Sequence, residues 1–384
     1  MSHRASLFLA DILGPIQGER LFMTKSKRVP SASSDGGAVE EGEWAGRKVA
    51  VTGGASFIGS HLVEALIARG AEVSVIDDLS SGRLNNLESV AGRFAFTQLD
   101  LEYSRIDEIT SAFEGNETLF HLAAIHGGRG YIDTHPADVC SNLAIDHHVY
   151  EAARKADVSQ VVFASSACVY PPALQAVEGS NYLLREEDCD PRKLGEPLSA
   201  DLEYGWAKVF GEVQLLAFIR QYGMKGASVR FITAYGPREN ETHAIIALIY
   251  KAIRRLDPYP IWGNGRQDRD FTYVTDIVEG TVRAAERITD GSAINLGNGR
   301  RYTMIEVAET IFDLVGWRPR EIFFDTSKPT GAVSRALDIQ KARDVLGWEP
   351  KVSFRDGLQS TIDWYLATHN GSVPTDERIL LERA

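Results

Sequence analysis

The sequence contains few cysteines, no long hydrophobic run and no excess of basic charge. Three cysteines occur in 384 residues, none in a CxxC or histidine-flanked cluster, so we expect free thiols, no disulfide scaffold and no metal site. Free thiols are typical of a reducing compartment, and we expect the cytoplasm. No segment approaches the roughly 20 apolar residues that span a bilayer. Asp11 interrupts the apolar stretch near the N-terminus and no small-residue cleavage site follows it, which argues against a signal peptide.

The charge excess is negative. The chain carries 41 basic and 53 acidic residues, a net charge of −12. An acidic protein repels nucleic acid and anionic membrane except at a local basic patch, and the sequence shows no basic stripe. We therefore expect neither as a partner. The composition, 44% hydrophobic and 24% charged, is that of an ordinary globular protein and excludes disordered or collagen-like chains.

The chain divides into a leader and two interleaved parts. Residues 1–46 are rich in serine, glycine and charge, which predicts a flexible leader. From Arg47, apolar strand-like runs alternate with segments of helical periodicity, which predicts a parallel sheet covered on both faces, a Rossmann-type doubly wound α/β fold. The expected domain comprises 47–236, with 271–298 returning to it. Residues 237–270 and 299–384 predict a smaller mixed α/β lobe that binds substrate at the carboxyl ends of the strands.

A glycine-rich turn, TGGASFIG, follows the first strand and precedes a helical segment. Glycines there let a pyrophosphate approach the backbone, and the helix N-terminus directs unpaired N–H groups at it. Ser56 stands where the pattern GxxGxxG has a glycine, and we expect its hydroxyl to donate to phosphate instead. The turn residues expected to contact a dinucleotide are Gly53, Ser56, Phe57, Ile58 and Gly59.

Acidic residues follow the next two strands. Asp77 ends the second strand, where a carboxylate binds ribose hydroxyls and repels a 2′-phosphate, so NAD is favoured over NADP. Asp100 and Leu101 follow the third strand and are expected to flank the adenine. An aspartate at a strand end also serves as a turn or cap residue.

Tyr204 and Lys208 lie four residues apart in a predicted helix, so both side chains share one face. A neighbouring ammonium favours phenolate, so we expect Lys208 to lower the pKa of Tyr204 from about 10 and make it a usable base. Ser166 and Cys168 emerge at the end of the fifth strand. The pattern predicts a catalytic group where the sheet meets its cofactor.

From about Lys48 to Leu366 the chain resembles an extended short-chain dehydrogenase/reductase of the NAD-dependent nucleotide-sugar epimerase/dehydratase family. The motifs TGGASFIG, HLAA, ASSACVYP, YGWAK, RFITAYGP and GRQDRDFTYVTD carry the resemblance. It implies that Tyr204, Lys208 and Ser166 remove a hydroxyl proton while hydride leaves the same sugar carbon for NAD. It implies a homodimer formed through two helices, one of them the Tyr204 helix. It also implies contacts from Ala123 and Asn142 to the cofactor, and from Arg269 and Arg335 to the nucleotide diphosphate.

The residues after Ser166 distinguish branches of the family. Dehydratases carry an Asp-Glu pair where this chain has Ala167 and Cys168, decarboxylases a glutamate at position 168, and simple 4-epimerases usually a threonine. Cys168 within SSACVYP, and the segment HGGRGYI, are similar to the GDP-mannose 3,5-epimerases. In those enzymes a 4-keto group acidifies the hydrogens at C3 and C5, and a thiol and a lysine exchange them. The resemblance assigns the thiol role to Cys168.

Other positions depart from that branch. His243 occupies the lysine position after a shortened loop, and an imidazole can take over its acid/base role. Thr233 replaces an asparagine and is expected to contact substrate. Gly128 is also expected to face the substrate, and Arg129 to face a charged group such as a carboxylate. Cys168 can instead be a small buried apolar residue, His243 a surface histidine, and each arginine a surface ion pair.

The sequence therefore predicts an NAD-dependent nucleotide-sugar epimerase that passes through a 4-keto intermediate and inverts C3, C5 or both. A UDP-hexose or UDP-uronate 4-epimerase, or a dehydratase or decarboxylase of the same family, is the alternative. A non-catalytic binding protein is disfavoured because Ser166, Tyr204 and Lys208 are all present. The nucleotide and sugar stay open.

Overall fold

The computed structural model describes residues 43–193 and 197–369. The leader predicted for residues 1–46 lies outside the described residues except for its last four. One of these, Trp44, is only 2% exposed, lies 5.8 Å from Phe120 between ring centroids and donates from Nε1 to Glu286. The sequence predicts that the folded part of the chain starts at Arg47. The buried Trp44 shows that it starts earlier.

A seven-stranded parallel sheet forms the centre of the larger domain, in the order β3-β2-β1-β4-β5-β6-β11. Alternate residues point to opposite faces: Val49 and Val51 join one apolar core, whereas Ala50 joins the other. The chain therefore has the predicted Rossmann-type doubly wound fold. The strands are β1 (Lys48–Thr52), β2 (Glu72–Asp77), β3 (Phe94–Gln98), β4 (Thr118–His121), β5 (Gln160–Ser166), β6 (Lys225–Phe231) and β11 (Asp290–Leu296).

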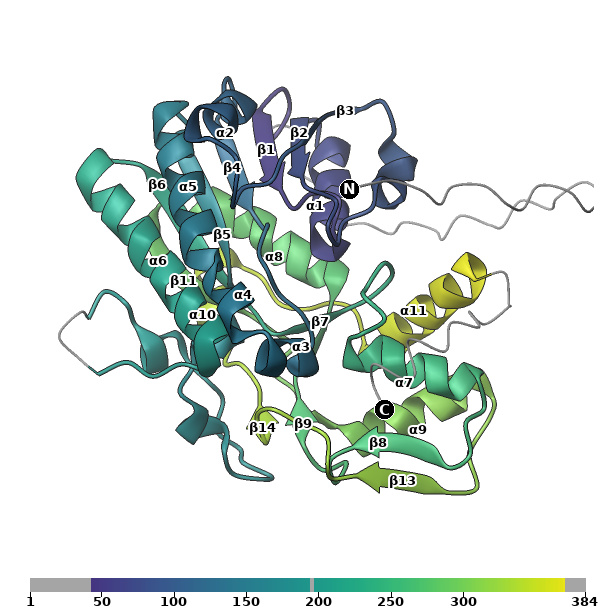
Figure 1. Cartoon of the computed structure of the whole chain (residues 1–384). Coiled ribbons are helices and arrows are strands. Elements are labelled where there is room, and N and C mark those ends of the chain that lie inside the picture. Colours follow the sequence, from purple (N-terminus) through teal and green to yellow (C-terminus); the bar gives the residue numbers. More distant parts are fainter. Residues whose placement is uncertain (1–42, 194–196, 370–384) are drawn as a thin grey trace, which may run out of the picture. The chain divides into compact units, whose positions relative to one another are not determined.

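Helices cover both faces of the sheet (Figure 1). One layer consists of α1 (Phe57–Ala68), α8 (Val274–Arg287) and α10 (Gln340–Leu346). The opposite layer consists of α2 (Ile106–Phe113), α5 (Asn142–Lys155) and α6 (Leu202–Tyr222). Leu62 and Leu66 of α1 are fully buried, and burial of each such side chain contributes about 1.5–3 kcal/mol.

A second apolar core forms the smaller lobe. Its helices are α7 (Ala244–Ile253), α9 (Met304–Val315) and α11 (Phe354–Thr368), and its strand pairs are β8 (Tyr259–Trp262) with β13 (Ile322–Asp325) and β7 (Thr233–Tyr235) with β10 (Phe271–Tyr273). Short strands β9 (Asp268–Arg269), β12 (Tyr302–Thr303) and β14 (Ser334–Arg335) form a third small sheet. Between these elements, α8 and β11 return to the large sheet. The predicted division into domains stays a prediction.

Two findings concern the membrane and the cysteines. Across residues 43–193 and 197–369, no helix is long and apolar enough to cross a membrane. All three cysteines lie in this part of the chain, and each is a free thiol.

Candidate active site

The glycine-rich turn between β1 and α1 is packed too closely for side chains. Gly53 has a φ of +68°, and a Cβ there would lie 2.8 Å from the Ala123 amide nitrogen. A Cβ on Gly59 would collide with the Gly53 carbonyl. The glycines therefore let the turn fold back against the segment that follows β4, at the point where the strand order reverses.

The N-terminus of α1 presents its first amide groups without a competing side chain. The first turn holds no acidic residue, and no side chain of the described residues caps it. Phe57, Ile58 and Gly59 supply those amides at the positive end of the helix, which suits a phosphate group. The Ser56 hydroxyl donates to the Gly53 carbonyl at 2.5 Å, and its expected contact with phosphate stays a prediction.

Asp77 joins the turn to the end of β2. Its carboxylate accepts hydrogen bonds from the amides of Ala55 (3.0 Å) and Leu79 (2.8 Å), and the residue is 6% exposed. Burial raises the pKa of Asp77, and the two amide donors oppose that rise. Each carboxylate oxygen retains a lone pair for a further donor, as binding of ribose hydroxyls requires.

Three other predicted cofactor contacts have local structural roles. Asp100 accepts from the amides of Glu102 and Tyr103 and so caps a turn. Leu101 packs into the α2–α5 core. Asn142, fully buried, exchanges hydrogen bonds of 2.8 Å with the Ile125 backbone in both directions. Asn142 therefore fixes the segment that follows Ala123 and lies against the glycine turn.

The predicted catalytic residues lie together at the carboxyl end of β5. Tyr204 and Lys208 lie on α6, with the Lys208 Nζ 5.9 Å from the Tyr204 ring centroid and 4.8 Å from that of Phe163. Tyr204 is hydrogen-bonded to Ser166. Lys208 is 2% exposed, and this burial lowers its pKa.

The expected lowering of the Tyr204 pKa is wrong. Burial raises the pKa of Tyr204 well above its usual value, the charges of Cys168 and Asp146 act in the same direction, and the hydrogen bond with Ser166 opposes them. The physical reason is desolvation, which disfavours a phenolate more than the nearby ammonium favours it.

Cys168 lies in a 3-10 turn that packs on the start of α6. Its carbonyl accepts the Asp201 amide at 2.9 Å, and a Cβ on Gly205 would collide with that carbonyl. The glycine of YGWAK therefore allows the turn to approach the helix. The Cys168 Sγ accepts a hydrogen bond from Arg335 at 3.3 Å, so the thiol faces a cation rather than an apolar core.

Three arginines converge beside this thiol. Asp201 accepts from Arg129 at 3.0 Å and from Arg335 at 2.5 Å. Burial, together with the charges of Arg335 and Arg129, lowers the pKa of Arg269 to about 10. Thr233 pairs in register with Phe271, two residues from Arg269. Asp201 therefore bridges Arg129 and Arg335, and Arg129 also pairs with Asp133 at 2.8 Å. Arg269 donates instead to the backbone carbonyls of Asp268 (2.7 Å) and Thr330 (2.6 Å).

His243 lies at the N-cap of α7, beside a buried carboxylate. Its Nδ1 is 3.3 Å from Oε1 of Glu239, whose side chain is 1% exposed. The His126 ring lies 6.3 Å from the His243 ring between centroids, and a Cβ on Gly128 would approach His243 to 3.8 Å. Desolvation, with the charges of His243 and Lys208, lowers the pKa of His126, but the residue is exposed to solvent, which weakens the desolvation effect.

Sequence reasoning missed the roles of His126, Glu239 and Asp201. The spacing of Glu239 and His243, four residues apart, is a signal for a side-chain pair. His126 stands in the glycine-rich segment that carried the resemblance. Asp201 precedes Tyr204 by three residues, and nothing local indicates that it bridges two distant arginines.

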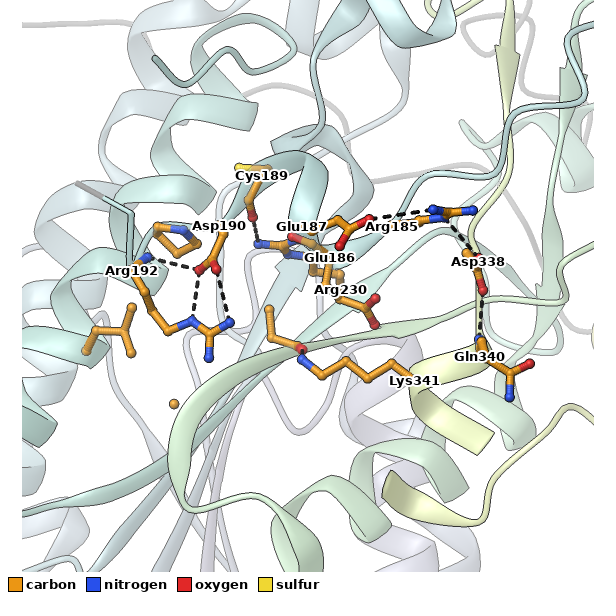
Figure 2. A pocket seen from close by; sticks show the side chains of 14 residues that line it. Arg185, Glu186, Glu187, Cys189, Asp190, Arg192, Arg230, Asp338, Gln340 and Lys341 are labelled. Carbon is orange, nitrogen blue, oxygen red and sulfur yellow. Dashed lines mark hydrogen bonds and ion pairs between the residues drawn. The ribbon is translucent and has the colours of Figure 1, made fainter. Parts of the chain in front are cut away.

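Another cavity, of about 320 Å³, lies between the β5–α6 connection and β11. Basic side chains that line this cavity are paired with carboxylates, as Figure 2 shows. Arg192 lies 2.9 Å from Asp190, and Arg185 lies 3.4 Å from Asp338. Lys341 donates to the Ala293 carbonyl at 2.6 Å. We assign no ligand to it.

A family model for the NAD dependent epimerase/dehydratase family matches residues 49–297. The chain belongs to this family. It is 32% identical over 322 residues to a UDP-glucose 4-epimerase of Mycolicibacterium smegmatis, covering 82% of this chain and 97% of the relative. It is 30% identical over 325 residues to GDP-mannose 3,5-epimerase 1 of Oryza sativa subsp. japonica, covering 83% and 81%.

A solved structure is also similar. A UDP-glucose 4-epimerase from Thermotoga maritima, crystallised with UDP-glucose, superimposes with a TM-score of 0.74 at 28% identity, over 84% of this chain and 99% of that one. The family is NAD-dependent, and the cofactor of this member is NAD. The close-packed glycine turn, the uncapped α1 and the buried Asp77 fit a dinucleotide. The individual site residues stay predictions.

Proposed function

We propose that the protein is a nucleotide-sugar epimerase that works through a 4-keto intermediate and exchanges protons at C3, C5 or both. The observation that carries the proposal is a surplus of acid/base groups. Inversion at C4 needs only the hydride carrier and the Ser166–Tyr204–Lys208 group, but this site also holds Cys168, His243 and His126.

Bound NAD would supply a reversible hydride acceptor for the sugar carbon. Tyr204 takes the proton of the sugar hydroxyl at its phenolic oxygen, and Ser166 holds that oxygen in a hydrogen bond. Lys208 supplies positive charge 5.9 Å from the Tyr204 ring centroid, which favours the phenolate. The amides at the start of α1 and the Asp77 carboxylate hold the dinucleotide.

Cys168 and His243 exchange the protons of the acidified carbons. The Arg335 guanidinium at 3.3 Å stabilises negative charge on the Cys168 sulfur. Glu239 orients His243 through Nδ1 and leaves Nε2 for the substrate. Arg269, Arg335 and Arg129 supply the cationic contacts for the diphosphate and for any acidic sugar substituent.

The test is incubation of the NAD-loaded protein with a panel of nucleotide sugars in D2O, followed by NMR. UDP-glucose, UDP-glucuronate and GDP-mannose form the first panel. Deuterium at C3 or C5 of the recovered sugar is the expected result. Cys168→Ser and His243→Gln should each abolish exchange, while the exposed Cys140 provides a matched control as Cys140→Ser.

A second candidate is a UDP-hexose or UDP-uronate 4-epimerase, which the likeness to UDP-glucose 4-epimerases favours. Product inverted only at C4 and free of deuterium would replace our proposal with this one. Accumulating NADH or released carbon dioxide would point to an oxidoreductase or a decarboxylase. Full turnover in Tyr204→Phe would refute the catalytic assignment in either case.

We also propose a homodimer and a cytoplasmic location. Trp206 and Phe210 lie four residues apart on α6 and are both exposed, as is Leu143 on α5. An apolar face of this kind on two neighbouring helices supports association of two copies through α5 and α6. Three free thiols are compatible with a reducing compartment.

A further inference from the structure

A buried histidine–carboxylate pair lies close to Lys208 and takes part in none of the steps above. Nε2 of His121, the last residue of β4, is 3.0 Å from Oδ1 of Asp146 in α5, and neither side chain is exposed. Nδ1 of His121 lies 2.8 Å from Oγ1 of Thr52, at the end of β1. The pair therefore connects the strand before the glycine turn to the helix that packs beside α6.

The histidine leaves the carboxylate charge uncompensated. Burial lowers the pKa of His121, and this effect outweighs the opposing contribution of Asp146. A neutral imidazole has one N–H, so Nε2–H donates to Asp146 and Nδ1 accepts from the Thr52 hydroxyl. Asp146 thus gains a hydrogen bond but no counter-charge from His121.

The second oxygen of Asp146 lies against α6. Its Oδ2 is buried and has no hydrogen-bond partner among the described residues, and a Cβ on Gly211 would come within 2.5 Å of it. Gly211 lies about one turn after Lys208 on the same helix. A glycine at this position makes room for the carboxylate next to the helix that carries the catalytic lysine.

Lys208 is a buried cation in the same neighbourhood as Asp146. Its Nζ lies 4.8 Å from the centroid of the Phe163 ring, and a Cβ on Gly211 would meet both that ring and Oδ2 of Asp146. Asp146, Glu212 and Cys168 favour the charged form of Lys208 against the cost of burial, while Lys208 lowers the pKa values of His121 and His126. Glu212 is already paired with the buried Arg230 at 2.7 Å. Asp146 therefore remains the nearby carboxylate whose charge is not balanced by another side chain.

We infer that Asp146, oriented by His121, is a positioning residue that keeps the Lys208 ammonium charged beside Tyr204. The inference rests on the proposed role of Tyr204 and Lys208, but not on the sugar or the carbon that is inverted. An ammonium in a dry site loses its proton readily unless a carboxylate faces it. The buried pair thus preserves the positive charge of Lys208, which favours the Tyr204 phenolate, whereas the direct effect of the Asp146 charge is to raise the pKa of Tyr204.

The test is an NMR titration of the full chain labelled with [ε-13C]lysine, without substrate, in which Lys208→Met identifies the Lys208 signal. In Asp146→Asn the pKa of Lys208 should fall by at least about one unit, because an attractive charge is lost while an acceptor for His121 remains. His121→Gln keeps a donor to Asp146 and its carboxylate, so the pKa of Lys208 should stay within about 0.3 units of the parent value.

The alkaline limb of the pH–rate profile of Asp146→Asn should move to lower pH together with the Lys208 titration. An unchanged Lys208 titration in Asp146→Asn, or equal shifts in both variants, would overturn the inference and make the pair purely structural. Because the titration needs no substrate, its outcome is independent of the proposed reaction.

A further measurement does not depend on the folding of Asp146→Asn. In Lys208→Met the buried Asp146 carboxylate loses the cation that interacts with it, so its charged form is less favourable in the folded state. That variant should then gain stability relative to the parent as the pH falls from 8 to 5, seen as a higher urea midpoint. Parallel curves for parent and variant would contradict the inference.

Discussion

Replacing Trp44 by alanine should destabilise the folded part of the chain by about 4 kcal/mol, because truncating a buried tryptophan costs about 3–5 kcal/mol. The side chain is 2% exposed, lies 5.8 Å from Phe120 between ring centroids, and has the Arg47 guanidinium 5.2 Å from its ring centroid. It also donates from Nε1 to Glu286 at 2.6 Å.

Phenylalanine at position 44 separates the contribution of the apolar ring contact from that of the hydrogen bond to Glu286. It retains most of the apolar ring contact but loses the donor to Glu286, and a hydrogen bond to a charged group is worth about 1.5–3 kcal/mol. We therefore expect Trp44→Phe to cost about 2 kcal/mol. Relative to a chain that lacks residues 1–42, removal of residues 1–44 should lower stability by about as much as Trp44→Ala does.

Urea unfolding followed by far-UV circular dichroism provides the measurement, with calorimetry as a second probe. At about 2 °C per kcal/mol for a chain of this length, the alanine variant should melt about 8 °C lower and the phenylalanine variant about 4 °C lower. Tyr103→Ala, at a residue 80% exposed, is the control and should change stability by less than about 0.5 kcal/mol. An alanine variant within about 1 kcal/mol of the parent would refute the assignment of Trp44 to the core.

Three further predictions concern the cofactor, the core and the assembly. Gly59→Ala places a Cβ against the Gly53 carbonyl, so NAD affinity measured by calorimetry should fall at least about tenfold, and an unchanged affinity would contradict the role of this turn. Glu212→Gln leaves the fully buried Arg230 without its counter-charge and should cost about 3–5 kcal/mol in urea unfolding; a near-neutral effect would show that the pair is dispensable. Phe210→Asp puts a charge on the exposed face of α6 and should convert the proposed dimer to a monomer in light scattering, where an unchanged mass would argue for another interface.

The order of the elements was predictable from the sequence because each one carries its own periodicity. Strand β1 and helix α1, for instance, follow from KVAVT and from apolar residues at helical spacing. Trp44 was missed because its neighbours are polar and its partner Glu286 lies 242 residues away. A local sequence pattern cannot indicate a contact between residues so far apart along the chain.

In the candidate site, too, the residues in local motifs could be predicted from the sequence, whereas those that depend on distant contacts could not. Tyr204, Lys208 and Asp77 lie in motifs whose spacing indicates their chemistry, and the structure brings the first two next to each other. The predicted direction of the Tyr204 pKa shift was wrong because the shift depends on burial in the folded site, which the YxxxK spacing does not indicate. Glu239 and Asp146 were not predicted as site residues because their importance depends on packing against distant elements.

The proposed substrate is an anionic nucleotide sugar, and the arginine cluster suggests how an acidic protein can bind it. Arg129, Arg269 and Arg335 lie close enough that the charges of the other two, together with burial, lower the pKa of Arg269 to about 10. Asp201 and Asp133 pair with two of these arginines, and the charge of Asp268 acts on Arg269. The three side chains still bring guanidinium N–H donors together at one place, so a protein with a net charge of −12 can offer an anion a local cationic contact. We expect a bound diphosphate to relieve the repulsion among these guanidinium groups, which favours the occupied site.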